Sequence, residues 1–496
     1  MKQALVAALL APLLFAGEAL ADAQTSRFAA GGYYRIMTRP DFQGGDSRLG
    51  LWNLGGRLLN EGPYGMLQLQ LNVLQSDLAR NEPWALVNAR IEGGSFANAD
   101  SGRGGLANFR VSGLFVQAGN ILLDHVTWQL GTLDFYPGDL GLYDLRPANL
   151  FNDTVGLSAL WRTDGLEVLV AAGDSGYGLR GTQYDTVFTS GAWVKARLGG
   201  QAELGVGGQL GLEPQVVGNR LAPYATPGID YADFVRGEVV KHYFEQNPHD
   251  DRIPLPEARA SSSWKLVGYL GFGKLGPLRW SSLYAHLARK HPDNFSSETY
   301  NGKGYTLYVH DLTDQRYEAQ VGNEMQLTVI PGVLDAAWGV LYGRELNQRN
   351  TIAAGEDNRS YLSTVLRLQA YATDTVHFLV ESSVSQERSL NGNLYREHVD
   401  SVFRSSDGLS NPRGLQFGDA DVRNTWQGKA GLVFNPAGRG IYNRPSLRLL
   451  YGLQYSNAQA AFANTFSSSL SQDQEFPQPS EKHWHSVIAL EAEGWF

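Results

Sequence analysis

Apolar and polar side chains alternate in residues 65–75, GMLQLQLNVLQ. In an extended strand Leu67, Leu69 and Leu71 point to one side, and the intervening amides point to the other. A helix would mix the two sets, so the stretch predicts a strand with one apolar face. A half-buried strand of a soluble sandwich alternates in the same way, which leaves open whether the leucines face a protein core or lipid.

The same alternation recurs further along the chain, in residues 192–198, 366–372 and 447–455. In each of these stretches the second face carries Arg or Lys. The interior of a water-filled barrel accepts such charges, whereas the core of a sandwich does not. A sandwich with these charges on its solvated face fits each single strand equally well, so the connections between strands have to decide.

Two kinds of connection are predicted between the strands. Tight turns rich in Gly, Pro and Asn are expected at 273–277, 331–332 and 435–438. Long polar connections are expected at 213–261, 286–320 and 385–424. Short turns at one end of a sheet and long loops at the other are typical of outer-membrane barrels.

The carboxyl-terminal stretch HSVIALEAEGWF is one more alternating strand, and it ends on the aromatic Phe496. Ile488 and Leu490 share one face, and Glu491 and Glu493 share the other. Such a strand is similar to the terminal strand of bacterial outer-membrane barrels. Together the patterns predict an all-β fold, a transmembrane antiparallel β-barrel with short periplasmic turns and long extracellular loops, and the chain length suits about 16–18 spanning strands.

The amino-terminal residues predict export. Lys2 precedes an apolar run at 4–16, and Ala19-Leu20-Ala21 has the small residues that a signal peptidase reads. We therefore expect a signal peptide at 1–21 and a single outer-membrane barrel domain at 22–496. No Cys follows that could carry a lipid anchor.

Composition agrees with a barrel in the bacterial outer membrane. The chain has no Cys, so no disulfide stabilises it, and its mean hydropathy is -0.26. No later stretch reaches the roughly 20 apolar residues of a membrane-spanning helix, so a membrane protein of this hydropathy has to cross with strands. The net charge of -9 argues against a nucleic-acid partner, which would select a basic face.

Five stretches of the sequence resemble, in the same order, the maltoporin family of carbohydrate-specific porins. These are GYYRIM, RLGLWNLGGRLLNEGPYGMLQLQLNVLQSD, ANFRVSGLFVQAGN, WQLGTLDFYPGDLGLYDLRPANL and NRPSLRLLYGLQYSNA. The resemblance covers the first third and the last fifth of the chain. It implies an 18-stranded homotrimeric channel in outer-membrane lipid, through which a carbohydrate solute slides along aromatic residues while charged side chains bind its hydroxyls.

The resemblance also implies a set of pore-lining residues. Tyr33 and Arg35 lie two apart in a strand and therefore share a face, which would be the lumenal one, with Tyr34 toward lipid. Trp84 would lie near the external entrance. The other predicted substrate-binding or pore-lining residues are Arg110, Asp139, Asp144, Arg146 and Arg448.

Ordinary structural roles account for the same residues. Tyr33 and Tyr34 fit an interfacial aromatic girdle, Arg110 a strand arginine, and Asp139 and Asp144 turn-forming aspartates. The sequence also departs from the family pattern, with Leu145-Arg146-Pro147 after the second acid and Tyr455-Ser456 near the end. These departures put selectivity for malto-oligosaccharides in doubt.

Other functions remain open as alternatives: a general porin, a polysaccharide-export barrel and a barrel-embedded lipid hydrolase. Gly173-Asp174-Ser175-Gly176 looks like the nucleophile segment of serine proteases, but the only upstream histidine is His125, so a hairpin turn is the simpler interpretation. His249 to Asp251 and His483 to His485 are metal candidates without a second cluster. We therefore expect no enzyme activity, no metal and no cofactor.

Overall fold

The computed structural model describes most of the chain after the expected signal peptide. The described residues are 26–39, 49, 53–75, 82–94, 109–175, 187–213, 220–221, 254–255, 260–289, 295–300, 303–308, 316–347, 359–389, 422–457 and 484–496. The predicted signal peptide at 1–21 lies outside these ranges, as do His249 to Asp251.

Eighteen long strands form one sheet. They are β1 (Phe28–Thr38), β2 (Tyr64–Leu74), β3 (Trp84–Gly93), β4 (Phe109–Gly119), β5 (Val126–Phe135), β6 (Leu150–Arg162), β7 (Leu166–Asp174), β8 (Phe188–Leu198), β9 (Ala202–Glu213), β12 (Ser261–Leu275), β13 (Leu278–Arg289), β16 (Arg316–Ile330), β17 (Leu334–Asn347), β18 (Arg359–Tyr371), β19 (Val376–Ser389), β20 (Val422–Phe434), β21 (Ser446–Ser456) and β22 (Trp484–Trp495). Two small sheets pair β10 (Arg220–Leu221) with β11 (Pro254–Leu255), and β14 (Phe295–Tyr300) with β15 (Lys303–Tyr308). A short 3-10 turn, η2, spans Asn53–Gly55.

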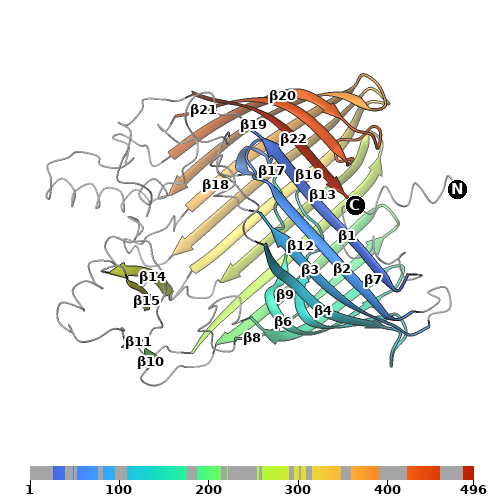
Figure 1. The fold of residues 1–496 in the computed structure, drawn as a ribbon, viewed down its shortest axis with the longest axis vertical. Helices are drawn as coiled ribbons and strands as arrows, with labels where there is room; N and C mark the ends of the chain where they lie inside the picture. The colour runs from blue at the N-terminus through green and yellow to red at the C-terminus, as the bar shows by residue number, and fades with distance from the viewer. Residues whose placement is uncertain are drawn as a thin grey trace.

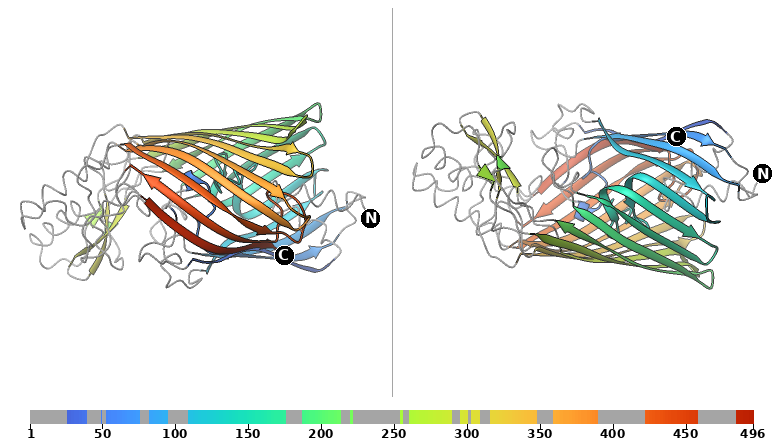
Figure 2. Two further views of the ribbon diagram at one scale, coloured as in Figure 1. Left: turned by 90° about the horizontal axis from the view of Figure 1, so that it is seen from above. Right: turned by 90° about the horizontal axis from the view of Figure 1, so that it is seen from below.

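The long sheet closes on itself. Every strand runs antiparallel to its neighbours, and β1 pairs with both β2 and β22. Gly32 and Phe496 complete the seam by exchanging backbone hydrogen bonds of 2.9 and 3.1 Å. Figures 1 and 2 show the tilted strands of the closed barrel, with the small sheets beyond one end. The predicted barrel is confirmed, and closure leaves its long strands without a free edge.

The two faces of the strands are those that the alternation predicts. Leu67 and Leu71 are exposed on the outside, at 36% and 45%, whereas Gln68 and Gln70 are buried inside. Aromatic side chains are exposed at both rims, with Phe378 and Phe434 at one end and Tyr455 and Trp484 among those at the other. An apolar outer surface between aromatic girdles is the signature of a bilayer-spanning barrel, and the protein is a bacterial outer-membrane barrel.

The described residues contain no helix that is long and apolar enough to cross a membrane.

Strand directions assign the two ends. The connections at 163–165, 199–201, 276–277 and 331–333 are short and lie at the end where β1 begins and β22 ends. The longest intervals between consecutive barrel strands, 214–260, 290–315, 390–421 and 457–483, belong to the opposite end. By the usual asymmetry of outer-membrane barrels, the first is the periplasmic end and the second the extracellular end.

Three connections fold into the lumen instead of projecting from it. Residues 53–63 and 136–149 enter from the extracellular end, and residues 435–445 enter from the periplasmic end. Leu140, Leu142, Tyr143 and Ile441 form an apolar core with side chains of the barrel wall. The tight turn predicted at 435–438 is thus part of a longer inward segment, and the three connections narrow the lumen at this level.

Wall glycines leave room for these segments. A side chain at Gly322 would collide with Leu140, and one at Gly452 would collide with Leu49 and Leu59. The inward-facing glycines of the strands therefore match apolar side chains of the connections, which explains why residues far apart in sequence pack closely inside the barrel.

Candidate functional site

Segment 53–63 is anchored to the barrel wall through its backbone carbonyls. Ser363 donates to Leu54 O, Ser383 to Gly55 O at 2.9 Å, and Lys429 to Gly55 O at 2.7 Å. Lys429 also pairs with Glu381 at 2.8 Å, and Glu381 pairs with Arg367 at 2.6 Å. Side chains of the barrel wall thus satisfy carbonyl oxygens at η2 that its own backbone leaves unbonded.

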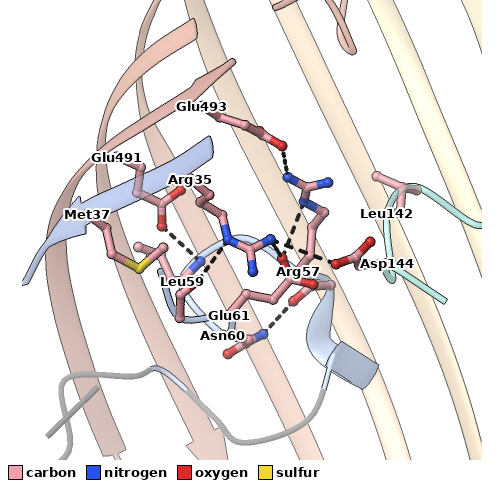
Figure 3. Close-up of polar contacts among 12 residues, drawn as sticks. Arg35, Met37, Arg57, Leu59, Asn60, Glu61, Leu142, Asp144, Glu491 and Glu493 are labelled. Carbon is pink, nitrogen blue, oxygen red and sulfur yellow. Dashed lines mark hydrogen bonds and ion pairs between the residues drawn. The ribbon is translucent and has the colours of Figure 1, made fainter. Parts of the chain in front are cut away.

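Glu493 on β22 is the centre of a buried charge cluster. Its carboxylate accepts hydrogen bonds from the Tyr33 hydroxyl at 2.6 Å and from Arg448 at 2.7 Å. Arg444 approaches it at 2.8 Å. Arg57 of the inward segment donates to it as well (Figure 3). The carboxylate is buried, and three guanidinium groups compensate for its lost hydration.

A second cluster lies where the two extracellular-side segments meet. Arg35 pairs with Glu61 and stands 3.8 Å from Asp144, while Arg57 N donates to Leu142 O at 2.8 Å (Figure 3). Burial raises the pKa of Glu61 to about 8, helped by the negative charge of Asp144 and opposed by Arg35 and Arg57. Burial acts on Asp144 in the same sense, but Arg57 and Arg35 outweigh it and lower the pKa of that carboxyl.

Segment 136–149 crosses to the far wall. Leu142 N donates to Glu324 Oε2 at 2.8 Å, and the Tyr143 hydroxyl donates to Ser363 O at 3.4 Å. Pro147 O lies 2.7 Å from the His286 ring. These contacts fix the middle of the segment against β13, β16 and β18, so that it narrows the lumen.

Tyr33 and Arg35 share a face, as their spacing predicts, and that face is the lumenal one. Both are buried, at 8% and 4% exposed, and both are bonded to other protein groups. Tyr33 also packs on Trp495 with ring centroids 4.6 Å apart. Neither side chain is free in this structure to serve as an open rail for a solute.

The other predicted residues lie in different surroundings. Arg448 is inward and bonded to Glu493. Arg146 stacks over the Tyr136 ring at 4.0 Å, and Asp139 lies in the same segment, where burial and the charge of Asp144 raise its pKa. The structure thus brings Tyr33, Arg35, Asp144 and Arg448 into one network and leaves Arg146 beside it.

Arg110 and Trp84 lie apart from this network. Arg110 begins β4 at the extracellular mouth, where its largely exposed side chain stands 3.5 Å from Glu92. Trp84 begins β3 at the opposite end, because the preceding connection joins the periplasmic ends of β2 and β3. The expectation that Trp84 marks the external entrance is therefore wrong; sequence shows that it starts a strand but not at which end.

The sequence did not reveal the residues that join the inward segments to the barrel wall. Arg57 and Glu61 belong to a connection, as do Tyr442 and Arg444, and period-two parity says nothing about where a connection points. Glu324 is on a strand, but its role depends on which segments reach it. A usable signal was the run of apolar residues at 49–59, since an exposed loop would not contain so many.

A cavity of about 480 Å³ opens at the periplasmic end, lined by residues of β8, β9, β12 and β13 and by Asp139 of segment 136–149. Its lining includes stacked Tyr269 and Tyr284, with ring centroids 5.1 Å apart, and Trp280. Glu203 and Arg197 also line it, paired at 3.2 Å. Aromatic faces stand next to hydrogen-bond donors and acceptors in a volume typical of small-molecule sites.

The serine segment does not form a hydrolase site. Ser175 follows β7 at the extracellular end, whereas His125 precedes β5 at the periplasmic end. Gly173 and Asp174 belong to β7 rather than to a hairpin turn, which corrects that part of the interpretation. Within the described ranges, no group of three His, Asp or Glu side chains is placed to hold a metal ion.

Comparison with known proteins finds solved structures of low similarity and no sequence relative. No protein-family model matches the chain, and no curated protein matches its sequence. Similar solved structures include Pseudomonas aeruginosa OprD (7% identity, 95% of each chain covered, TM-score 0.40) and Vibrio cholerae OmpT (8%, 95% of this chain and 97% of that one, 0.39). Another is P. aeruginosa OccK2 (OpdF) in complex with glucuronate (9%, 95% and 98%, 0.42).

At these identities and TM-scores no residue role or solute carries over to this protein. The resemblance to maltoporins receives no support from the family models. The general class does hold, because the closed 18-stranded barrel with a polar, charged interior is a porin-type fold.

Proposed function

We propose that this protein is an outer-membrane channel for small polar solutes, narrowed by segments 53–63 and 136–149. The closed barrel and its charged interior support passage of polar molecules. The apolar core around Leu142 and Tyr143 argues for a narrow path rather than a wide general pore.

Within this class we propose neutral sugars as the solutes. The observation that carries this proposal is the cavity with Tyr269, Tyr284 and Trp280 beside Arg197 and Glu203. The apolar face of a sugar ring packs on aromatic rings, and its hydroxyls need both donors and acceptors in exchange for water. The cavity supplies both kinds of group.

The alternatives differ in the charge that the lumen should present. A barrel that exports an acidic polymer needs a surplus of unpaired Arg and Lys along its path. Here Arg367, Lys429 and Arg448 are each paired with a buried glutamate. Paired charge favours a neutral solute over an acidic polymer.

Single-channel recording in planar bilayers tests the proposal. Neutral mono- and disaccharides at millimolar concentration should reduce the current in a concentration-dependent way. Trp280→Ala should weaken this block by about 1 kcal/mol, the scale of a lost aromatic contact, whereas Tyr455→Ala on the outer face should not. A current that no sugar blocks would leave a general channel, and a current blocked only by acidic oligosaccharides would favour the exporter.

The homotrimer implied by the maltoporin resemblance also stays a proposal. Native mass spectrometry of the detergent-solubilised protein would distinguish a trimer from a monomer.

A further inference from the structure

Two glutamates of the barrel wall each hold one segment from the extracellular side and the same turn from the periplasmic side. Glu324 accepts Leu142 N on Oε2 and the Tyr442 hydroxyl on Oε1, at 2.8 and 2.5 Å. Glu493 accepts Arg57 of segment 53–63 and Arg444, the latter at 2.8 Å. Turn 435–445 is therefore joined through the wall to both segments that narrow the lumen.

The turn has an outer part in solvent and an inner part in the core. Pro436, Ala437 and Arg439 are exposed, and Arg439 pairs with exposed Asp374 at 2.9 Å. Ile441 is buried in the apolar core of the lumen, and Gly440 O accepts from Gln369 at 3.2 Å. The inner half is thus fixed, while the outer half reaches the periplasmic surface.

Both glutamates are buried, at 0% exposed, so water does not readily replace a hydrogen bond that either carboxylate loses. Without the Tyr442 hydroxyl, Oε1 of Glu324 has lost its hydrogen-bond donor in a buried site. The carboxylate then lowers its free energy by moving toward other donors or toward solvent. Leu142 N would lose its acceptor in the same movement. Arg444 acts alike on Glu493, because its removal takes away one of the three guanidinium contacts that hold this buried carboxylate, which can then move together with Arg57.

We propose that turn 435–445 sets the aperture of the channel from the periplasmic side, with Tyr442 and Arg444 as positioning residues that hold segments 136–149 and 53–63 through Glu324 and Glu493. This inference rests on the proposed channel function for its consequence, but the coupling itself can be measured without any current. The expected effect of loosening the turn is a larger and less stable aperture.

Single-channel recording is the first test. Tyr442→Phe and Arg444→Gln should raise the conductance and add brief substates, and Arg444→Lys should restore much of the wild-type behaviour. Arg439→Gln is the matched control, because it removes a charge from the same turn at its exposed end. Conductance equal to the control in both inner variants would overturn the proposal.

Thiol labelling is the second test and is independent of conduction. The chain has no Cys, so Leu142→Cys provides a single buried reporter on segment 136–149. Its reaction with a small methanethiosulfonate should become about tenfold faster with Tyr442→Phe, the change expected when a hydrogen bond to a charged group is lost. Arg439→Gln should leave the rate unchanged. Faster labelling in a protein without channel currents would refute the proposed function but support the coupling, and unchanged labelling would refute the coupling.

Discussion

Replacement of Glu381 by Gln tests how the narrowed lumen is stabilised. Glu381 is 1% exposed and lies between Arg367 at 2.6 Å and Lys429 at 2.8 Å. Lys429 in turn donates to Gly55 O of the inward segment. The variant keeps the size of the side chain and leaves two buried cations without their counter-charge.

The expected loss of stability follows from this arrangement. Removal of one partner from a buried ion pair costs about 3–5 kcal/mol, because the remaining charge stays in a poorly hydrated site. The Gln carbonyl still accepts one hydrogen bond, so we expect Glu381→Gln to lose about 3 kcal/mol. Arg367→Met removes one of the cations, and the double variant should therefore lose less than the sum of the two single variants, by about 1–3 kcal/mol.

The assay is equilibrium unfolding in urea of protein folded into lipid vesicles, followed by tryptophan fluorescence. Glu92→Gln is a matched control, because Glu92 is partly exposed near the extracellular mouth and pairs with Arg110 at 3.5 Å. A loss below about 1 kcal/mol for Glu381→Gln, or strict additivity with Arg367→Met, would refute the reasoning. Either result would mean that water enters the lumen and solvates these charges.

Three further predictions concern the lipid face, the lumenal core and pH. Leu69→Arg should destabilise the barrel folded in vesicles by about 2–4 kcal/mol if the residue lies near the bilayer midplane, and Leu69→Ala should destabilise it much less. Trp193→Ala should cost about 3–5 kcal/mol in urea titration, since the side chain is fully buried in the lumenal core; a cost under about 1 kcal/mol would contradict that packing. The raised pKa of Glu61 means that its contribution to stability is present below its ordinary pKa of 4.5 and is lost as pH rises through about 8. Over the same rise the reversal potential should shift toward cation selectivity, and a shift that persists in Glu61→Gln would assign it to another group.

Strand parity was determined by the sequence alone. Leu67 faces outward and Gln68 inward, and Tyr33 and Arg35 share one face, as the alternation predicts. This works because neighbouring residues of a strand point to opposite faces whatever the rest of the chain does. The repeated pattern and the spacing of turns were enough to predict a barrel, and the chain length was enough to predict about the observed strand number.

Only the tertiary structure decided what fills the barrel. Arg57 and its partner Glu493 are 436 positions apart, and Tyr442 and Glu324 are 118 apart, so no local pattern relates them. The same holds for Trp84, whose end of the barrel depends on the direction of every strand before it. A connection has no fixed period, and its path is set by the wall it meets: glycines that leave space for apolar side chains and buried glutamates that accept its donors. Those features exist only when eighteen strands have closed into one sheet.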